Sequence, residues 1–393
     1  MPIDPNTLVD TPSTDEQISQ RLGGIKLIVN GHECNQWDDI NIDSDIGIPA
    51  DGWSFAWLDM DIANLPDDIK SGAVCQISYQ ATPKDENIQA PEQSLMIGVI
   101  DRIQQTITRG QLAVVISGRD LAGQLLDTSV PIRQAQNMTL EEILQQFVFG
   151  GDLSSLPWRV IPQNVNWLKA KTGVQDGESV WDAINKAAES SGQYVWMSSD
   201  GALCIGNPFN VSQPYPVRLV FHKQSEHNII DQLAYSEDLS NAYSLVEVVG
   251  QDDKGKNFRG TATDDRLNIK RRKIISDARA ENQSEAMQYA QKALRDSWLN
   301  AYECTINIPD WVFFDLGWRL TLESDVVPRS TGEWVVYGRT MKLSRDAGKT
   351  TELRLRKYDE WMQPVQYVEL VKDTKAKSRK KKQVTVKSKR GAK

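Results

Sequence analysis

The sequence predicts a mainly β chain with a small α+β insert and a basic tail. β-rich runs fill the first 120 residues and return after about residue 228. Helix signatures with their own cap residues fall between these two regions, and the chain from residue 372 onward is almost entirely polar and basic. Apolar residues make up 40% of the 393 residues, which is enough to build several domains of ordinary size.

The first 129 residues are predicted to contain an N-terminal arm and a β domain. Residues 1–20 are polar and proline-containing, so we expect a loose arm. Residues 21–129 are expected to fold as the first β domain. Apolar side chains alternate along residues 25–29, as they do in a strand with one buried face. Further strands are predicted at residues 53–60, 73–79, 95–107 and 112–117.

Residues 130–210 are predicted to form the α+β insert. Thr139 and Glu142 have the spacing of a capping box, in which the two side chains satisfy free backbone N–H groups at the start of a helix. Ser179 is the predicted cap of a second helix. A β-hairpin with its turn at residues 200–201 follows.

Residues 211–365 are predicted to form a second β domain that contains one long helix. The helix is expected at residues 284–300, and residues 252–260 are interpreted as a loop. The predicted apolar face of the helix consists of Met287, Ala290, Leu294 and Trp298. Strands are predicted at residues 301–308, 318–322, 334–343 and 351–356.

Charge separates the tail from the body. Residues 372–393 hold eleven Lys or Arg and one acid, a net +10, so the chain's total of −8 leaves −18 for residues 1–371. An acidic body argues against a protein that grips nucleic acid with its main surface. Residues 366–393 are predicted to be a flexible, disordered basic tail. Three roles remain open for it: a solubilising end, a segment that binds DNA or an acidic protein, and a segment that folds on a partner subunit. The candidate contact residues are Arg379, Lys380, Lys381 and Lys382.

No catalytic, cofactor-binding or metal site is predicted. The four cysteines lie far apart, which indicates reduced core residues rather than zinc ligands. Gly348-Lys349-Thr350 resembles the end of a phosphate-binding loop, but Leu343 stands where the first glycine should be, so a hairpin turn is predicted. We find neither a signal peptide in the first 21 residues nor an apolar run of membrane-spanning length.

Two further residue classes have possible functional meanings. Acidic pairs such as Asp51 with Asp59, or Asp264 with Asp265, could serve glycoside hydrolysis, but solvated surface is the expected role of these residues. Tryptophans could bind sugar rings, but the periodicity places three of them in a core or a subunit interface. These are Trp181, Trp298 and Trp334.

Two segments resemble a known family. Residues 116–127, with the sequence ISGRDLAGQLLD, are similar to the strand-to-helix segment of Mu-like phage baseplate hub proteins, which belong to the wider late-control-D family of contractile-tail hubs. Residues 177–184, followed by residues 192–196 and 200–203, resemble the LysM-like insert of the same proteins. The resemblance covers about residues 20–365.

The resemblance implies a structural role without catalysis or cofactors. Such hubs contain two tube-type β-barrel domains with smaller inserted domains. Three copies form a ring that joins the six-fold tail tube to the three-fold membrane-piercing spike, and DNA passes through its lumen. The expected partners are therefore the chain itself as a homotrimer, the tail-tube protein, the central spike protein and other baseplate proteins, without integral membrane contact. The expected location is the virion baseplate of a contractile tail, a late protein assembled in the host cytoplasm for DNA ejection.

One alternative is a peptidoglycan-binding tail or cell-wall protein that uses the LysM-like insert. A cell-wall hydrolase is a further alternative, although we find no catalytic motif for it.

Overall fold

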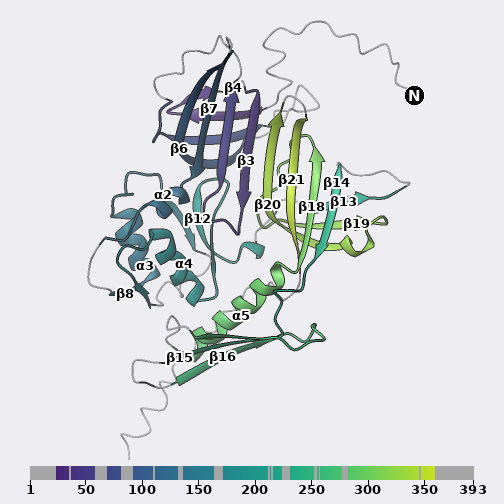
Figure 1. The fold of residues 1–393 in the computed structure, drawn as a ribbon. Coiled ribbons are helices and arrows are strands. Elements are labelled where there is room, and N and C mark those ends of the chain that lie inside the picture. Colours follow the sequence, from purple (N-terminus) through teal and green to yellow (C-terminus); the bar gives the residue numbers. More distant parts are fainter. Residues whose placement is uncertain are drawn as a thin grey trace, which may run out of the picture.

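A computed structural model confirms a mainly β fold with an α+β insert (Figure 1). It places two β units side by side, an insert below the first, and a fourth unit at the far end. The structure describes residues 24–34, 37–57, 69–80, 92–108, 111–131, 136–162, 171–210, 213, 216–223, 231–251, 255, 257–276, 282–344 and 347–358. The predicted N-terminal arm and basic tail lie outside these residues.

The first β unit is an antiparallel sheet around its own apolar core. Its strands are β1 (Gly24–Val29), β2 (His32–Cys34), β3 (Asp39–Asp45), β4 (Gly52–Trp57), β5 (Val74–Gln80), β6 (Glu92–Thr108) and β7 (Gln111–Asp120). They are ordered β3-β4-β7-β6-β5-β1-β2 across the sheet. Inward positions alternate with outward ones, and the core includes Phe55 and the stacked rings of Trp37 and Trp57, whose centroids are 4.0 Å apart.

The second β unit has its own core around Trp334, which is fully buried. Its strands are β13 (Val217–Phe221), β14 (Gln232–Glu237), β18 (Tyr302–Pro309), β19 (Arg319–Ser324), β20 (Gly332–Ser344) and β21 (Gly348–Lys357), with a short 3-10 turn η5 (Pro328–Ser330) before β20. The hairpin turn predicted around residue 348 is confirmed between β20 and β21. Gly348 adopts a φ of +67° there, a conformation that glycine accepts without strain.

Strand β20 joins the two units into one continuous sheet. It pairs with β21 on one side and with β3 on the other, from Gly338 opposite Asp45 to Leu343 opposite Ile40. Trp334 and Val336 on β20 pack into the second core, whereas Met341 and Leu343 pack into the first. A bulge between Val336 and Gly338 lies between these two pairs of residues.

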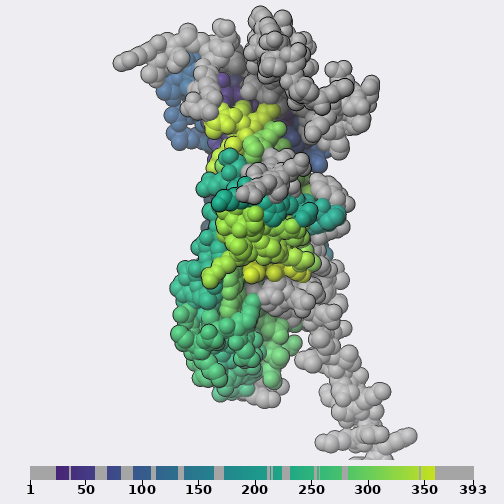
Figure 2. Space-filling view, turned by 90° about the vertical axis from the view of Figure 1, so that its right-hand side faces the viewer, coloured from purple at the N-terminus to yellow at the C-terminus, as the bar shows by residue number. Residues whose placement is uncertain are grey.

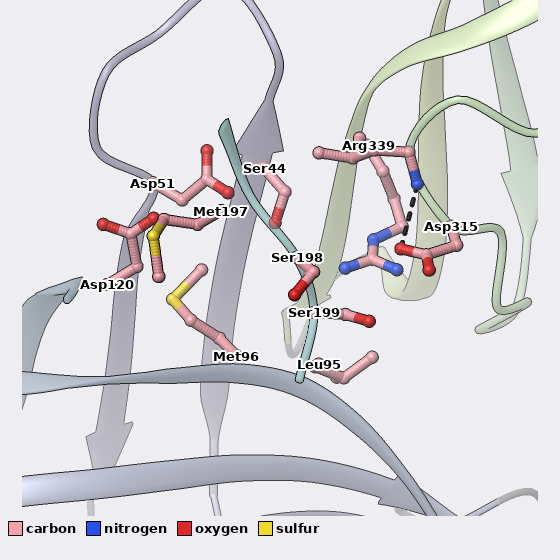
Figure 3. Close-up of a pocket in the computed structure, with 11 residues that line it drawn as sticks. Ser44, Asp51, Leu95, Met96, Asp120, Met197, Ser198, Ser199, Asp315 and Arg339 are labelled. Atoms are coloured by element: carbon pink, nitrogen blue, oxygen red, sulfur yellow. Dashed lines mark hydrogen bonds between the residues drawn. The ribbon is translucent and has the colours of Figure 1, made fainter. Parts of the chain in front are cut away.

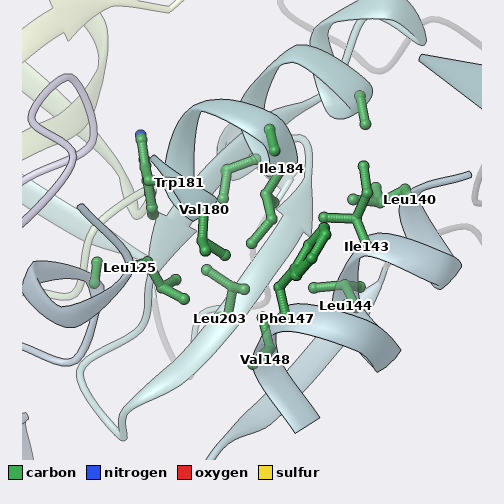
Figure 4. Packing of buried hydrophobic residues seen from close by; sticks show 14 of the residues in the cluster. Leu125, Leu140, Ile143, Leu144, Phe147, Val148, Val180, Trp181, Ile184 and Leu203 are labelled. Atoms are coloured by element: carbon green, nitrogen blue, oxygen red, sulfur yellow. The ribbon is translucent and has the colours of Figure 1, made fainter. Parts of the chain in front are cut away.

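The insert packs its helices around one apolar core (Figure 4). Its elements are α2 (Ala122–Asp127), β8 (Gln136–Thr139), α3 (Leu140–Ile143), the π-helical η2 (Leu144–Phe149), β9 (Arg159–Pro162), β10 (Lys171–Val174), α4 (Val180–Ser190), β11 (Tyr194–Met197), β12 (Ala202–Gly206) and the 3-10 turn η4 (Pro208–Asn210). The predicted capping box is confirmed, because Glu142 N donates to Thr139 Oγ1 at 3.1 Å and Thr139 N donates to Glu142 Oε2 at 2.7 Å. The predicted hairpin is confirmed as β11 and β12.

The fourth unit is a helix on a three-stranded sheet. It comprises β15 (Leu245–Gln251), β16 (Asn257–Thr263), β17 (Arg272–Ser276) and α5 (Gln283–Leu299). The predicted helix is confirmed, but the sequence did not reveal that this unit has a core separate from the second β unit. The loop interpretation of residues 252–260 is wrong from Asn257 onward, where β16 begins. Space-filling Figure 2 shows this unit at one end of an elongated molecule.

One residue of the predicted helix face is misplaced. Met287 is 42% exposed, because the buried stripe of α5 follows Ala286, Ala290, Leu294 and Trp298 at steps of four residues. The strand beneath the helix comes very close at Gly260. A Cβ there would lie 2.1 Å from the backbone of Ala286, so only glycine fits this contact.

Candidate assembly surface

The continuous sheet presents a polar face opposite its two apolar cores. Four strands of each unit contribute to it, in the order β14-β18-β21-β20-β3-β4-β7-β6. Alternation along each strand places one set of side chains in a core and the other set outward. The outward set on β3 is Asp39, Asn41, Asp43 and Asp45. The neighbouring strands add small or neutral polar residues, such as Ser54, Ser117, Thr305 and Asn307, together with charged ones.

Arg354 connects the two units on this polar face. Its guanidinium donates to Asp45 Oδ2 at 2.9 Å, to Asp43 Oδ1 at 3.0 Å and to Thr340 Oγ1 at 2.8 Å. To reach β3 from β21, the side chain must cross β20 at Gly338, where a Cβ would lie 2.5 Å from Arg354 Nε. The absence of a side chain at Gly338 therefore opens the path for this ion pair.

Charges on the polar face nearly cancel. Besides the Arg354 cluster, Lys342 pairs with Glu352 at 3.4 Å and Arg356 pairs with Glu303 at 2.9 Å. These pairs link adjacent strands, and they leave no large field of one sign.

A second polar cluster lies behind the sheet, where the two β units and the insert meet (Figure 3). It surrounds a cavity of about 10 Å³, the room of about one water molecule. Figure 3 shows Asp51 and Asp120 on one side and Arg339 with Asp315 on the other. The lining comes from β3, β6, β7, β11, β20, the turn between β11 and β12, and the loops before β4 and β19. The lining residues are Ser44, Asp51, Leu95, Met96, Asp120, Met197, Ser198, Ser199, Asp315, Leu316 and Arg339.

We call this meeting point of the two β units and the insert the joint. The acids that line its cavity resist ionisation. Burial, and then the neighbouring Asp120 charge, raise the pKa of Asp51 well above its ordinary value. Burial also raises the pKa of Asp120 to about 7. Arg339 is 1% exposed and donates one hydrogen bond, to the Phe314 carbonyl at 2.9 Å. The joint therefore holds a buried cation among carboxyls whose pKa values burial raises above their ordinary values.

The insert is fixed to its neighbours by close contacts. Ser94 Oγ donates to the Ser199 carbonyl at 2.8 Å, which ties β6 to the turn between β11 and β12. In that turn Gly201 has a φ of +76°, and a Cβ there would lie 2.7 Å from Ile97. The turn can therefore seat against β6 only with glycine at this position.

A third polar cluster joins the insert to α5. Lys292 is buried and pairs with Asp296 at 2.8 Å and Glu189 at 3.6 Å. Tyr194 of β11 donates to the same Asp296, and burial raises the pKa of its phenol well above the ordinary value. The insert thus contacts every other unit of the chain, which fixes their relative orientation.

The structure places the candidate residues of the sequence in different environments. The tail residues Arg379, Lys380, Lys381 and Lys382 lie outside the described residues, so their contact with an acidic partner stays a prediction. The three tryptophans predicted to point inward are confirmed as buried: Trp181, Trp298 and Trp334. Since the insert's Trp196 is buried as well, neither it nor Trp181 is available to stack on a sugar ring.

The expectation of a solvated surface is wrong for Asp51. Its side chain accepts from Asp45 N at 2.8 Å and is covered by the insert and the second β unit. Its predicted pair partner, Asp59, lies outside the described residues. Of the other pair, Asp264 forms an ion pair with Arg266 at 2.7 Å. Sequence reasoning also missed β3, because its Asp-rich outward positions lower the apparent β propensity of the segment.

Among the described residues we find no group of ligands with the arrangement of a metal site. Within the same part of the chain, none of the helices combines the length and apolarity needed to span a bilayer.

Comparison with known families identifies two parts of the chain. Residues 24–120 match the N-terminal domain of the Mu phage baseplate assembly proteins described as GpP-like. Residues 122–207 match the second domain of the gp44-like baseplate hub proteins. The predicted resemblance to Mu-like baseplate hub proteins is thereby confirmed. Comparison with curated protein sequences gave no match.

Solved structures of tail proteins share the fold over most of the chain. A tail protein from Neisseria meningitidis is 25% identical, with a TM-score of 0.67 over 86% of this chain and 98% of the other. The 43 kDa tail protein of prophage MuSo2 from Shewanella oneidensis is 14% identical, with a TM-score of 0.66 over 85% and 98%.

The fold extends to a secretion system. A type VI secretion component from E. coli, described as similar to the phage T4 tail proteins gp27 and gp5, is 11% identical. Its TM-score is 0.50 over 86% of this chain and 78% of the other. At these low identities, the Shewanella and E. coli proteins establish a shared fold only.

Proposed function

We propose that this chain, which carries the first two domains of a Mu-like phage baseplate hub, is the structural hub of a contractile tail baseplate. Its role in the virion is to hold other proteins in position rather than to catalyse a reaction. Three copies form a ring that joins the six-fold tail tube to the three-fold central spike and leaves a lumen for DNA. The copies are made and assembled in the host cytoplasm.

The observation that carries this proposal is the continuous sheet with two open ends. Inside one chain, β20 and β3 already join one β unit to the next. Among the described strands, β14 and β2 lie at the two ends of the path and have one partner strand each. We call the pairing of β20 with β3 the seam. Pairing of β14 in one copy with the β2 end of the next would repeat this seam between copies and bury both edges. A head-to-tail contact of this kind closes into a ring.

The polar face supports the passage of DNA. It has small polar side chains and nearly balanced charge, whereas a surface that grips phosphates needs unpaired Lys and Arg. If this face lines the lumen, DNA can slide past it without being retained.

Mass and cross-linking test the ring. Light scattering of the full chain should give about three times the 44.2 kDa of one copy. Cys34 lies on β2 and is half-buried, while the other three cysteines are buried. An Ala234→Cys variant on the exposed edge strand β14 should therefore cross-link to Cys34 of the next copy with a short bis-maleimide.

The cross-linked products should stop at three chains on a denaturing gel. Adding Cys34→Ser to the Ala234→Cys variant is the matched control and should abolish the trimer band. A monomeric mass at micromolar concentration, or ladders that grow without limit, would show that the ends do not close a three-membered ring.

A further inference from the structure

A basic, partly apolar patch lies on the fourth unit, far from the polar face. The eight residues 266–273 include five Lys or Arg and no acid, in a body whose net charge is −18. Ile269 and Ile274 lie in and beside this segment and are 69% and 60% exposed. Of the two, Ile274 lies on strand β17 itself, next to Arg272 and Lys273, so this strand exposes an apolar side chain beside two cations.

The open face of the sheet adds to the positive charge. On the side away from α5, Glu247 of β15 is nearly buried between Arg259 and Arg272. One carboxylate therefore serves two guanidinium groups, whose side chains remain 56% and 60% exposed. Both arginines keep donors available for further carboxylates.

Strand β17 is an open edge. It pairs in parallel with β15, and among the described residues no strand lies on its other side. Four of its five residues are exposed. Arg272 and Ile274 share one face of the strand, while Lys273 lies on the other, with Nζ 5.3 Å from the ring centroid of Tyr243. An edge like this is a ready template for an added strand.

We propose that the β17 edge docks an acidic extended segment of a partner protein, which adds to the sheet as a fourth strand. A carboxylate beside Arg272 and an apolar side chain two residues along, beside Ile274, would match the exposed face. Cations alone could merely guard the edge against self-pairing, but that role does not account for the exposed isoleucines. Phosphates of a nucleic acid would likewise leave these side chains without an apolar contact. The inference does not depend on the hub function.

The test uses the full chain and two labelled probe peptides. The first, Thr-Glu-Thr-Val-Thr-Glu-Thr-Val with blocked ends, alternates acid and valine on one face. The second replaces each Glu by Lys. Fluorescence anisotropy should show saturable binding of the first peptide and none of the second. The double variant Arg272→Glu with Lys273→Glu should weaken binding about tenfold or more, because the peptide's Glu loses its charge-assisted partner at Arg272 and meets two added negative charges at the edge.

Matched variants separate docking from general electrostatics. Lys70→Glu changes an exposed lysine of the first β unit and should leave binding unchanged. Ile274→Asn keeps all charges and should also weaken binding, which simple charge attraction would not produce. Equal binding of both peptides, or no effect of the double variant, would overturn the proposal. Loss of duplex DNA or phosphatidylserine-vesicle binding in that variant, without peptide binding, would overturn it in favour of another anionic surface.

Discussion

Two arginines of the second β unit lie on opposite faces of the same sheet and do different work. Arg354 on the polar face is 21% exposed and reaches two carboxylates and a hydroxyl of the seam through well-directed hydrogen bonds. Arg339 faces the joint with the insert, is 1% exposed, and donates one hydrogen bond to a carbonyl. Both sit among acids, but only Arg354 has direct ion pairs with them within 4 Å.

The two arginines therefore have different roles. Arg354 helps to determine which strands pair, whereas Arg339 balances buried negative charge. At the seam, water still reaches the charged groups, so the ion pairs add little to the free energy of unfolding. Their main effect is to determine which strands pair. In the joint, the cation and the three acids Asp51, Asp120 and Asp315 line the same buried cavity. Removing one buried charge leaves the others unbalanced, so the joint should be both more sensitive to mutation and more sensitive to pH.

The largest expected effect comes from removing the buried cation. Arg339→Met should lower the free energy of unfolding at pH 8 by about 3–5 kcal/mol, because the joint's carboxylates lose their counter-charge. At pH 5 the loss should be smaller, since Asp120, whose pKa is about 7, is then largely protonated. Urea unfolding at both pH values measures the difference. Arg329→Met, at an exposed ion pair with Glu237, is the control and should change little. An equal loss at both pH values would refute the charge-balance account.

The second-largest expected effect is the pH dependence that Asp120 gives to the free energy of unfolding. The pKa of Asp120 is about 7 in the folded chain, against 3.8 as its ordinary value, so the unfolded chain loses this proton first as pH rises. Stability from this group is therefore full below about pH 4 and is lost as pH rises to about 7. Asp120→Asn should raise the free energy of unfolding at pH 8 by up to about 4 kcal/mol and change it little at pH 4. Thermal unfolding across this range should show a flatter profile, and an unchanged slope would contradict the assignment.

Mutations at the seam should lower the free energy of unfolding by less than mutations in the joint. Arg354→Met should cost about 1–2 kcal/mol, the scale of a partly exposed set of charge-assisted hydrogen bonds. Gly338→Ala should cost a similar amount, because its Cβ would displace the same guanidinium. The two changes remove one interaction, so the double variant should lose about as much as either single one. Additive losses would show that Gly338 matters for another reason.

The smallest effect belongs to the exposed pair of Lys342 with Glu352. Its N–O distance is 3.4 Å, and the lysine side chain is 47% exposed. Lys342→Ala should change the free energy of unfolding by less than about 0.5 kcal/mol, and raising the salt concentration should shrink even that. A loss as large as that of Arg354→Met would remove the proposed distinction between bridging and peripheral ion pairs on this face.

Signals confined to a few neighbouring residues were readable from the sequence. The capping box at Thr139, the hairpin turn at Gly201 and the helix that ends near Leu299 each depend on local backbone chemistry, and the structure confirms them. The same holds for the order of a β region, an α+β insert and a second β region. The resemblance carried by residues 116–127 also proved sound, because it rests on a contiguous segment.

Only the tertiary structure decided what covers each polar residue. Asp51 and Arg339 are 288 positions apart in the chain, and nothing near either one indicates that they share a cavity. Strand β3 reads as a polar segment until β20 pairs with it and Arg354 binds its aspartates. Side-chain alternation predicts which face of a strand is apolar. The residues that contact the polar face come from distant parts of the sequence, so alternation does not predict them. The local sequence therefore determined the elements and their order, and long-range contacts determined the joints that make them one assembly unit.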